Sequence, residues 1–125
     1  RKVMTALISG GFKAQADRAV VDLGIKHAFA ACEYFFDSKG KLVAWNLLPC
    51  DYDGKVDFMH LIIKEHGLSK KQCGFVGDSV NDIALAKEVG VSIAFNGNQR
   101  LQDITTYAVN QPAGREDFRA ILKYF

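Results

Sequence analysis

The chain has 125 residues, three cysteines and a formal net charge of +2, which is enough for one domain with an ordinary core. The near-neutral charge gives no electrostatic reason to expect nucleic acid or an anionic membrane as a partner. No apolar run approaches the roughly 18 residues that a membrane-spanning helix needs, and no signal peptide is visible. The odd number of cysteines and the lack of a C-x-x-C pair favour a reducing compartment, so we expect a cytoplasmic protein.

Short apolar runs typical of strands alternate along the chain with segments of helical periodicity. In chain order, the expected elements are a strand at 3–8, a helix at 13–23, a hairpin of strands at 29–36 and 42–47, a helix at 55–66, a strand at 74–77, a helix at 81–89, a strand at 91–95, a short helix near 99–104, a strand at 106–109 and a closing helix up to 125. Four apolar residues are expected on one face of the closing helix: Phe118, Ile121, Leu122 and Phe125. This alternation predicts an α/β fold, with a mostly parallel sheet in a three-layer arrangement and a β-hairpin insertion.

The segment 77–82, G-D-S-V-N-D, lies between a predicted buried strand and a predicted helix. In an open α/β sheet, ligands bind at the carboxyl ends of the strands. Gly77 is expected to let the backbone turn sharply, so that Asp78 projects into the crevice and Asp82 lies on the same side of the first helical turn. Two carboxylates close together at a helix start suit Mg²⁺. The alternative is that either acid merely caps the helix.

Two further candidates are the run Ser9-Gly10-Gly11 and the side chain of Lys55. The run ends a predicted strand and opens a predicted helix, so its N–H groups, its hydroxyl and the helix start suit an oxyanion, although such a turn is often only a loop. Lys55 is expected in the first turn of a helix, where a cation opposes the helix dipole. A solvated lysine is the ordinary interpretation, and a phosphate beside Mg²⁺ would give Lys55 a role as its counter-charge.

The order and spacing of these three signals resemble the haloacid dehalogenase superfamily of phosphohydrolases, and within it the members of phosphoserine phosphatase type. The likeness spans nearly the whole chain and is carried by I-S-G-G-F at 8–12, by 77–82, by V-S-I-A-F at 91–95 and by the ending I-L-K-Y-F. The resemblance implies a Rossmann-like core. It also implies that Ser9 and the amide of Gly10 bind the transferring phosphoryl group, and that Lys55 is the family's cation.

In the same family, the residues of the G-D-x-x-N-D element bind the metal ion or support its binding. Asp78 matches the Mg²⁺ ligand, Asn81 matches a residue that reaches phosphate or substrate, and Asp82 matches one that supports Lys55 and the waters of the metal. A dehalogenase proper works without metal, so the paired acids argue against it. A P-type ATPase phosphorylation domain also carries G-D-x-x-N-D, but its second motif reads T-G-D rather than S-G-G.

The sequence departs from the family at the first motif, D-x-D-x-[T/V], which supplies the nucleophilic aspartate and the general acid/base. That motif should lie upstream of Ser9, where this sequence has eight residues and none of them is acidic. The D-x-D letters at 51–53 come after the second motif, and we interpret them as a turn and a helix cap. We therefore expect residues 1–125 to be the C-terminal portion of a single hydrolase core domain. An N-terminal segment of the same protein, or another chain, would supply the missing central strand and the substrate-selecting cap.

The resemblance implies a magnesium-dependent phosphomonoester hydrolase that acts through an aspartyl-phosphate whose nucleophile lies outside this chain. Residues 1–125 alone are then expected to be inactive. Phosphoserine is the substrate that the family suggests, and another small phosphorylated metabolite, such as a sugar phosphate, is left open. The alternative is a module that binds phosphate and Mg²⁺ but has no nucleophile and no activity.

Overall fold

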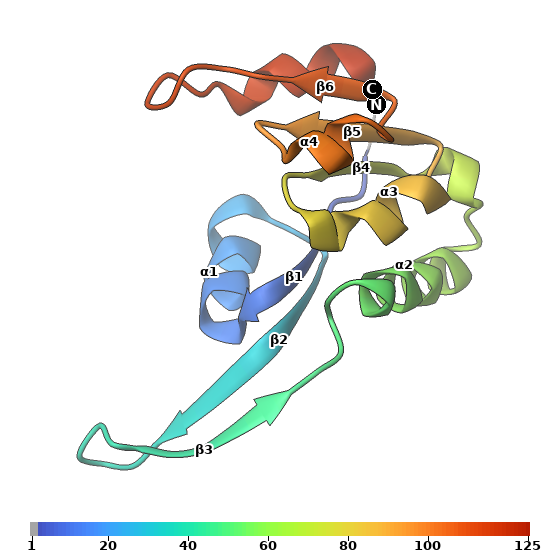
Figure 1. Cartoon of the computed structure of the whole chain (residues 1–125). Helices are drawn as coiled ribbons and strands as arrows, with labels where there is room; N and C mark the ends of the chain where they lie inside the picture. Colours follow the sequence, from blue (N-terminus) through green and yellow to red (C-terminus); the bar gives the residue numbers. More distant parts are fainter. Residues whose placement is uncertain (1–2) are drawn as a thin grey trace. The chain divides into compact units, whose positions relative to one another are not determined.

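The computed structural model describes residues 3–125, and the chain divides into two compact units, Arg1–Phe58 and Met59–Phe125. The first unit holds β1 (Ala6–Phe12), α1 (Lys13–Leu23), β2 (His27–Phe36), β3 (Leu42–Leu47) and the start of α2 (Asp53–His66). The second holds the rest of α2, the 3₁₀ turn η1 (Lys70–Gln72), β4 (Gly74–Gly77), η2 (Val80–Asp82), α3 (Ile83–Glu88), β5 (Val91–Phe95), α4 (Gln99–Gln102), β6 (Tyr107–Val109) and the 3₁₀ helix η3 (Phe118–Tyr124). Figure 1 labels the helices and strands along the chain.

In the first unit, β1 and β2 are parallel and β2 and β3 are antiparallel, in the order β1-β2-β3. The helix α1 makes the crossover from β1 to β2, and it ends as expected at Gly24, which adopts a left-handed conformation with φ of 66°. The start of α2 packs on β2 through Phe58, whose ring centroid lies 4.5 Å from that of Phe29. Because β2 lies between them, β1 and β3 are the edge strands of this sheet.

The first predicted strand is displaced in the structure. It begins at Ala6 rather than at Val3, and it runs through Ser9 and both glycines to Phe12 instead of ending at Ser9. The register explains this difference, because Ser9 pairs with Ala30 and Phe12 pairs with Cys32, so that two residues of β1 oppose one of β2. Such a bulge lets the strand continue past residues that read as a turn. The expectation that the Ser-Gly-Gly run ends the strand is therefore wrong, whereas α1 begins at Lys13 as expected.

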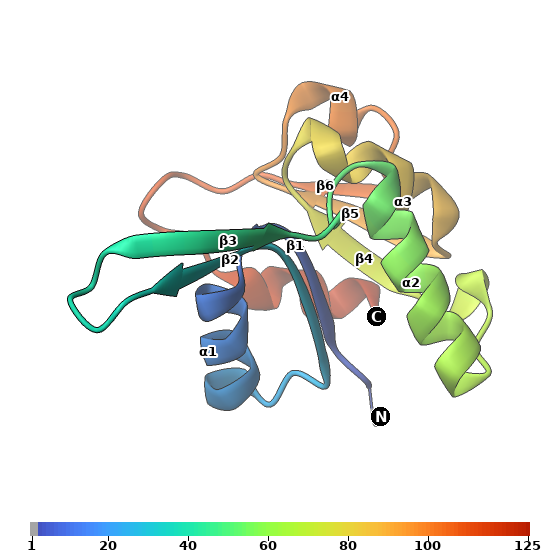
Figure 2. The same cartoon turned by 90° about the horizontal axis from the view of Figure 1, so that it is seen from below.

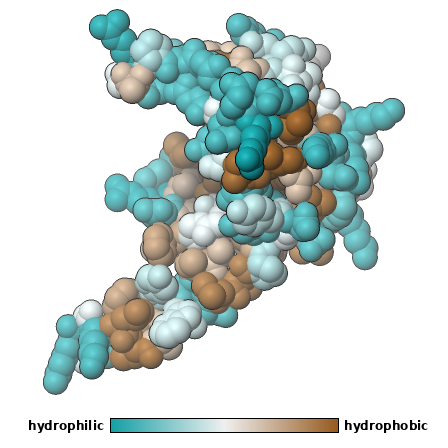
Figure 3. Space-filling model, viewed as in Figure 1, coloured by the Kyte–Doolittle hydropathy of each residue, from teal (hydrophilic) through white to brown (hydrophobic). Residues whose placement is uncertain are grey.

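The predicted β-hairpin is confirmed, and it carries much of the exposed apolar surface of the first unit. Its turn is closed by the carboxylate of Asp37, which accepts hydrogen bonds from the backbone N–H groups of Lys39 and Lys41 at 2.8 and 2.9 Å. The hairpin extends beyond α1 in Figures 1 and 2, and Figure 3 shows apolar surface along it. The large apolar side chains exposed on it are Tyr34, Phe35, Phe36, Leu42, Val43, Trp45 and Leu47.

In the second unit, three parallel strands lie in the order β4-β5-β6. Figures 1 and 2 show α3 and α4 on one face of this sheet and η3 on the other. On the first face, Ala86, Ala94 and Leu101 form a buried cluster. On the second face, the rings of Phe95 and Phe118 meet edge to face with centroids 5.2 Å apart. The predicted α/β class with its mostly parallel strands is confirmed.

Three details of the second unit differ from expectation. β4 is half-buried rather than buried, because it is an edge strand with β5 as its neighbour. The helix expected at 81–89 is a 3₁₀ turn followed by the short α3. The closing helix is also 3₁₀ rather than α, and of its four apolar residues Ile121 is buried while Phe118, Leu122 and Phe125 are exposed. Over residues 3–125, none of the helices has both the length and the apolarity to cross a membrane.

Candidate functional site

The second unit presents its two candidate acids in different environments. Asp82 is 3% exposed, and its Oδ2 accepts hydrogen bonds from the backbone N–H groups of Asp78 at 2.9 Å and Ser79 at 3.1 Å. Asp78 is exposed at the carboxyl end of β4, and its Oδ1 accepts a hydrogen bond from the Ser79 hydroxyl at 3.3 Å. A carboxylate that accepts backbone N–H groups stabilises a turn strongly. Asp82 therefore holds the loop, and Asp78 presents its carboxylate from it.

Gly77 is required for a different reason from the one expected. Its φ is not positive, so the backbone does not need glycine in order to turn there. A Cβ atom on residue 77 would instead lie 2.6 Å from Oδ2 of Asp82 and 2.8 Å from the ring of Phe75. The close approach of the Asp82 carboxylate thus excludes any side chain at this position.

The donors of this loop fit a hard cation. Mg²⁺ binds proteins through one or two carboxylates and keeps waters or phosphate oxygens at its other positions. Asp78 offers such a carboxylate at a strand end, where it is exposed, whereas Oδ2 of Asp82 is occupied by two backbone N–H groups. Asn81 is half-buried between them in η2, and both Asn81 and Asp82 have further interaction partners. The arrangement suits Asp78 as a direct ligand and Asp82 as its support.

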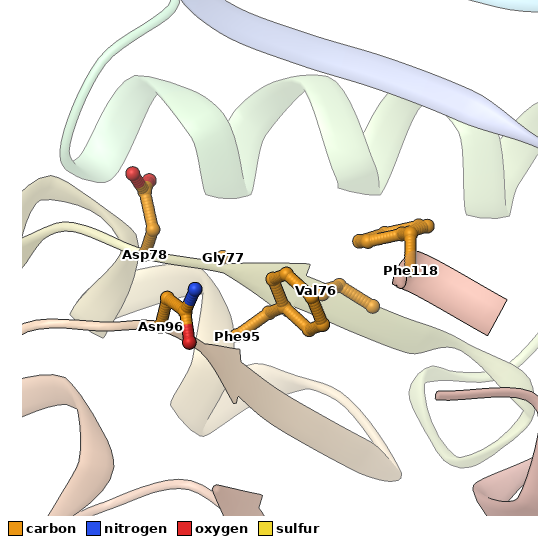
Figure 4. Close-up of a pocket in the computed structure, with 6 residues that line it drawn as sticks. All are labelled: Val76, Gly77, Asp78, Phe95, Asn96 and Phe118. Carbon is orange, nitrogen blue, oxygen red and sulfur yellow. The ribbon is translucent and has the colours of Figure 1, made fainter. Parts of the chain in front are cut away.

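A pocket of about 370 Å³ lies beside Asp78 within the second unit. Figure 4 shows the residues that line it, which are Val76, Gly77, Asp78, Phe95, Asn96 and Phe118. Asn96 follows β5 as Asp78 follows β4, so both side chains come from the carboxyl ends of neighbouring parallel strands. Sequence analysis missed Asn96, because the run Asn96-Gly97-Asn98 has the composition of an ordinary turn.

In the first unit, the Ser9 hydroxyl accepts a hydrogen bond from the backbone N–H of Gly11 at 3.0 Å. The hydroxyl hydrogen of Ser9 is not used by this bond, so it can still be donated to a ligand. The carboxyl group of Asp51 packs directly on Gly10, since a Cβ atom on residue 10 would lie 3.1–3.3 Å from its carboxyl carbon and oxygens. A side chain at residue 10 would thus have to displace the Asp51 carboxyl group slightly.

Asp51 combines the expected role with an unexpected contact. The expected turn is present: the Asp51 carboxylate accepts the Tyr52 N–H at 3.2 Å, the Asp51 carbonyl accepts the Gly54 N–H at 2.8 Å, and α2 begins at Asp53. Its contact with Gly10 was not expected, because the two residues are far apart in the sequence and no local pattern links them. The contact brings the loop before α2 to the Ser-Gly-Gly run.

Lys55 is only 6% exposed, so the interpretation as a solvated lysine is wrong. A buried lysine needs polar partners, and Lys55 has at least one. The charges of Asp51 and Lys55 also act on the neighbouring Cys50. Burial and the carboxylate of Asp51 raise the pKa of its thiol, while Lys55 lowers it. Gly54 shapes this loop, because a Cβ atom there would lie 1.6 Å from the carbonyl oxygen of Pro49. The first unit therefore places Asp51 and Lys55 near one buried thiol, with the carboxyl group of Asp51 also against Gly10.

The comparisons with known proteins agree on one family. A model of the haloacid dehalogenase-like hydrolases matches residues 1–90. The phosphoserine phosphatase of Methanocaldococcus jannaschii is 29% identical over 131 aligned positions, which cover 99% of this chain and 56% of that protein. The phosphoserine phosphatase of Haemophilus influenzae is 32% identical, over 85% of this chain and 33% of that protein.

A solved structure described as a phospho-aspartyl intermediate analogue of phosphoserine phosphatase is similar to the chain in three dimensions. It superposes with a TM-score of 0.82 and 29% identity, over 96% of this chain and 55% of that one. The chain thus spans about half the length, or less, of the relatives that it matches.

Proposed function

This chain belongs to the haloacid dehalogenase-like hydrolases, and on that premise we propose that it is part of a phosphomonoester hydrolase. The substrate would be a small phosphorylated metabolite, for which the similar phosphoserine phosphatases suggest phosphoserine. Phosphoryl transfer to an aspartate outside this chain, followed by hydrolysis of the aspartyl-phosphate, is the proposed mechanism. The phospho-aspartyl analogue of a phosphoserine phosphatase supports that mechanism.

In this proposal the first unit supplies groups that bind the phosphoryl oxygens. Ser9 donates its hydroxyl hydrogen, the backbone N–H of Gly10 donates a second hydrogen bond, and Lys55 contributes positive charge. Such donors act where charge spreads over the oxygens in the transition state. The burial of Lys55 supports this role, because a buried ammonium has lost most of its water and interacts more strongly with an anion.

The second unit supplies the metal site in this proposal. Asp78 would hold Mg²⁺, Asp82 would keep Asp78 in place, and Asn81 would reach the phosphate or the substrate. When bound, the ion would neutralise charge on the phosphoryl oxygens. The single observation that carries the proposal is the exposed Asp78 carboxylate at the end of β4, on a loop held by the carboxylate of Asp82.

We further propose that an additional strand completes the sheet. Within their own units, both β1 and β4 are edge strands and each has one hydrogen-bonded neighbour. An open edge offers unpaired backbone groups to another strand. The strand that carries the nucleophile would come from an N-terminal segment of the same protein or from another chain. The proposed compartment is the cytoplasm, in keeping with three free cysteines among the described residues.

The test uses residues 1–125 together with the proposed D-x-D-x-[T/V] segment, whether that segment belongs to the same protein or to another chain. Asp78→Asn and Lys55→Met should each lower kcat for phosphoserine at least about a hundredfold, since loss of one transition-state contact typically costs about 3 kcal/mol. Asp103→Asn and Lys64→Met, which change exposed residues of the same types, should leave kcat within about twofold. Near-normal turnover by either site variant would overturn the assigned roles.

A second measurement separates the enzyme from the binding module. Residues 1–125 alone should release no phosphate from p-nitrophenyl phosphate with Mg²⁺, because the nucleophile lies elsewhere. Magnesium-dependent turnover by this chain would refute the proposed mechanism. A complete gene product that binds phosphate and Mg²⁺ but never turns over would instead favour the inactive module.

A further inference from the structure

The distal part of the hairpin is a sheet of two strands only. β1 pairs with β2 as far as Cys32, and beyond that point β2 has β3 as its one hydrogen-bonded neighbour among the described residues. Large apolar side chains are exposed along this part, which reaches beyond α1 (Figures 1 and 3). A hairpin of two strands is only marginally stable in water unless further strands or a packed layer support it.

The free edge of the hairpin is β3, and neither charge nor proline protects it. Natural proteins commonly block an edge strand with a lysine, another charge or a proline within the strand. The six residues of β3 read L-V-A-W-N-L, and all six are exposed. Lys41 and Pro49 lie outside the two ends of the strand. The edge of β3 is therefore open to pairing with another strand.

The register shows which backbone groups β3 directs to its open edge. The N–H of Leu48 donates to the carbonyl of Ala31 at 2.8 Å, and the pairing with β2 is regular over residues 44–47. Hydrogen-bonded and non-hydrogen-bonded pairs alternate in an antiparallel ladder. The even-numbered residues of this stretch therefore bond to β2, whereas Trp45 and Leu47 direct their N–H and C=O groups to the open edge.

This part of β3 is complementary to a second copy of itself. If two β3 strands run antiparallel about a twofold axis at Asn46, then Trp45 of each copy lies opposite Leu47 of the other. Both residues have outward backbone groups, so the pairing forms four N–H···O=C hydrogen bonds. Their side chains project from the same face of the sheet, so each indole packs beside a leucine of the second copy.

The charges of the hairpin also permit this pairing. Residues 33–47 hold two acids, Glu33 and Asp37, and two lysines, Lys39 and Lys41, so the segment is neutral and two copies do not repel each other. A twofold axis uses the same surface on both copies and closes the assembly at two. The open edge of β1 takes no part, so it stays available to the additional strand proposed above.

We propose that β3 is a homodimer interface, at which two copies of the chain pair antiparallel and join their hairpins into one four-stranded sheet. The pairing satisfies the outward backbone groups of Trp45 and Leu47, and it gives each hairpin the further strands that it lacks. The inference concerns the first unit alone and does not rest on the proposed function.

The fluorescence of Trp45 reports on this edge directly, because Trp45 is the only tryptophan of the chain. Residues 1–125 are followed by sedimentation equilibrium and by tryptophan emission over a dilution series. We expect a dimer whose dissociation moves the emission to longer wavelength, since Trp45 then enters water. Leu47→Lys places a charge on the edge and should raise the dimer dissociation constant at least about tenfold. Leu61→Lys, the same change at an exposed leucine of α2, should alter it less than about twofold.

A cysteine cross-link tests the register. The two copies of Asn46 form a non-hydrogen-bonded pair, whose Cα atoms lie about 4.5 Å apart, within the range that a disulfide spans. Asn46→Cys should therefore give a disulfide-linked dimer with diamide as the oxidant, above any background from Cys32, Cys50 and Cys73 in the original chain. Ala44→Cys is the matched control, because its counterpart lies four residues, or about 13 Å, further along the second strand. It should add no cross-link.

Four results would overturn the inference. A chain that stays monomeric at every concentration has no such interface. A dimer that Leu47→Lys leaves unchanged associates through another surface, and equal cross-linking of Asn46→Cys and Ala44→Cys contradicts the twofold register. If the D-x-D-x-[T/V] segment dissolves the dimer when it is added, that segment occupies the edge in place of a second copy. None of these results concerns phosphate release, so the proposed function would stand.

Discussion

The carboxylate of Asp82 offers a direct test of how the candidate metal loop is held. Its Oδ2 accepts two backbone hydrogen bonds, from Asp78 and Ser79, and the side chain is 3% exposed. Asp82→Asn keeps the shape and one acceptor oxygen but removes the charge. Asp82→Ala removes the acceptor and leaves both N–H groups without this partner.

The expected cost follows from the two hydrogen bonds. A hydrogen bond to a charged group contributes about 2 kcal/mol and a neutral one about 1 kcal/mol. Asp82→Asn should therefore lower the free energy of unfolding by about 2 kcal/mol, and Asp82→Ala by about 4 kcal/mol. With a urea m-value of about 2 kcal/mol/M, the first change lowers the urea midpoint by about 1 M.

The assay is urea unfolding of residues 1–125 followed by circular dichroism, together with amide hydrogen exchange read by NMR. The exchange of the Asp78 and Ser79 N–H groups should speed up most, because these two groups lose the charged acceptor. Asp103→Asn is the matched control, because Asp103 is exposed and accepts a side-chain hydrogen bond from Gln99. The urea midpoint of this variant should move little.

One result would refute this reasoning. If Asp82→Asn unfolds at the same urea concentration as Asp103→Asn, and the two loop amides exchange at unchanged rates, then Asp82 does not hold the loop. The assignment of Asp78 as a carboxylate presented by that loop would lose its structural basis.

Two further predictions concern the loop before α2 and the end of α3. Gly54→Ala places a Cβ atom against the Pro49 carbonyl, so it should cost about 3 kcal/mol of unfolding free energy, and an unchanged urea midpoint would contradict the contact. A hydrogen bond from Lys70, its charge and a weaker effect of His60 hold the pKa of Glu88 below its usual range. The stability that this ion pair contributes is present above the unfolded glutamate pKa of about 4.3 and is lost as the pH falls through the lower folded value. Glu88→Gln should therefore flatten the acid side of the midpoint-against-pH curve, and a curve identical to that of the original chain would count against the pair.

Much of the secondary structure follows from local patterns in the sequence. The helix at 13–23 with its Gly24 stop, the hairpin around residues 37–40 and the strand at 91–95 were all expected and are observed. These elements depend on hydrophobic periodicity and on turn residues, which act over a few positions. The strand through Ser9 to Phe12 was not expected, because its extent depends on pairing with β2.

The sequence by itself also determined the family and the types of residue at the candidate site, since the Ser-Gly-Gly run, Lys55 and G-D-x-x-N-D are read directly from the chain. Only the tertiary structure decided what each residue does there. It separates the buried Asp82 from the exposed Asp78, brings Asp51 onto Gly10 and turns the amide of Asn96 into a pocket. The physical reason is that burial, close approach and the direction of a hydrogen bond depend on neighbours that are distant in the sequence, and a local pattern does not contain them.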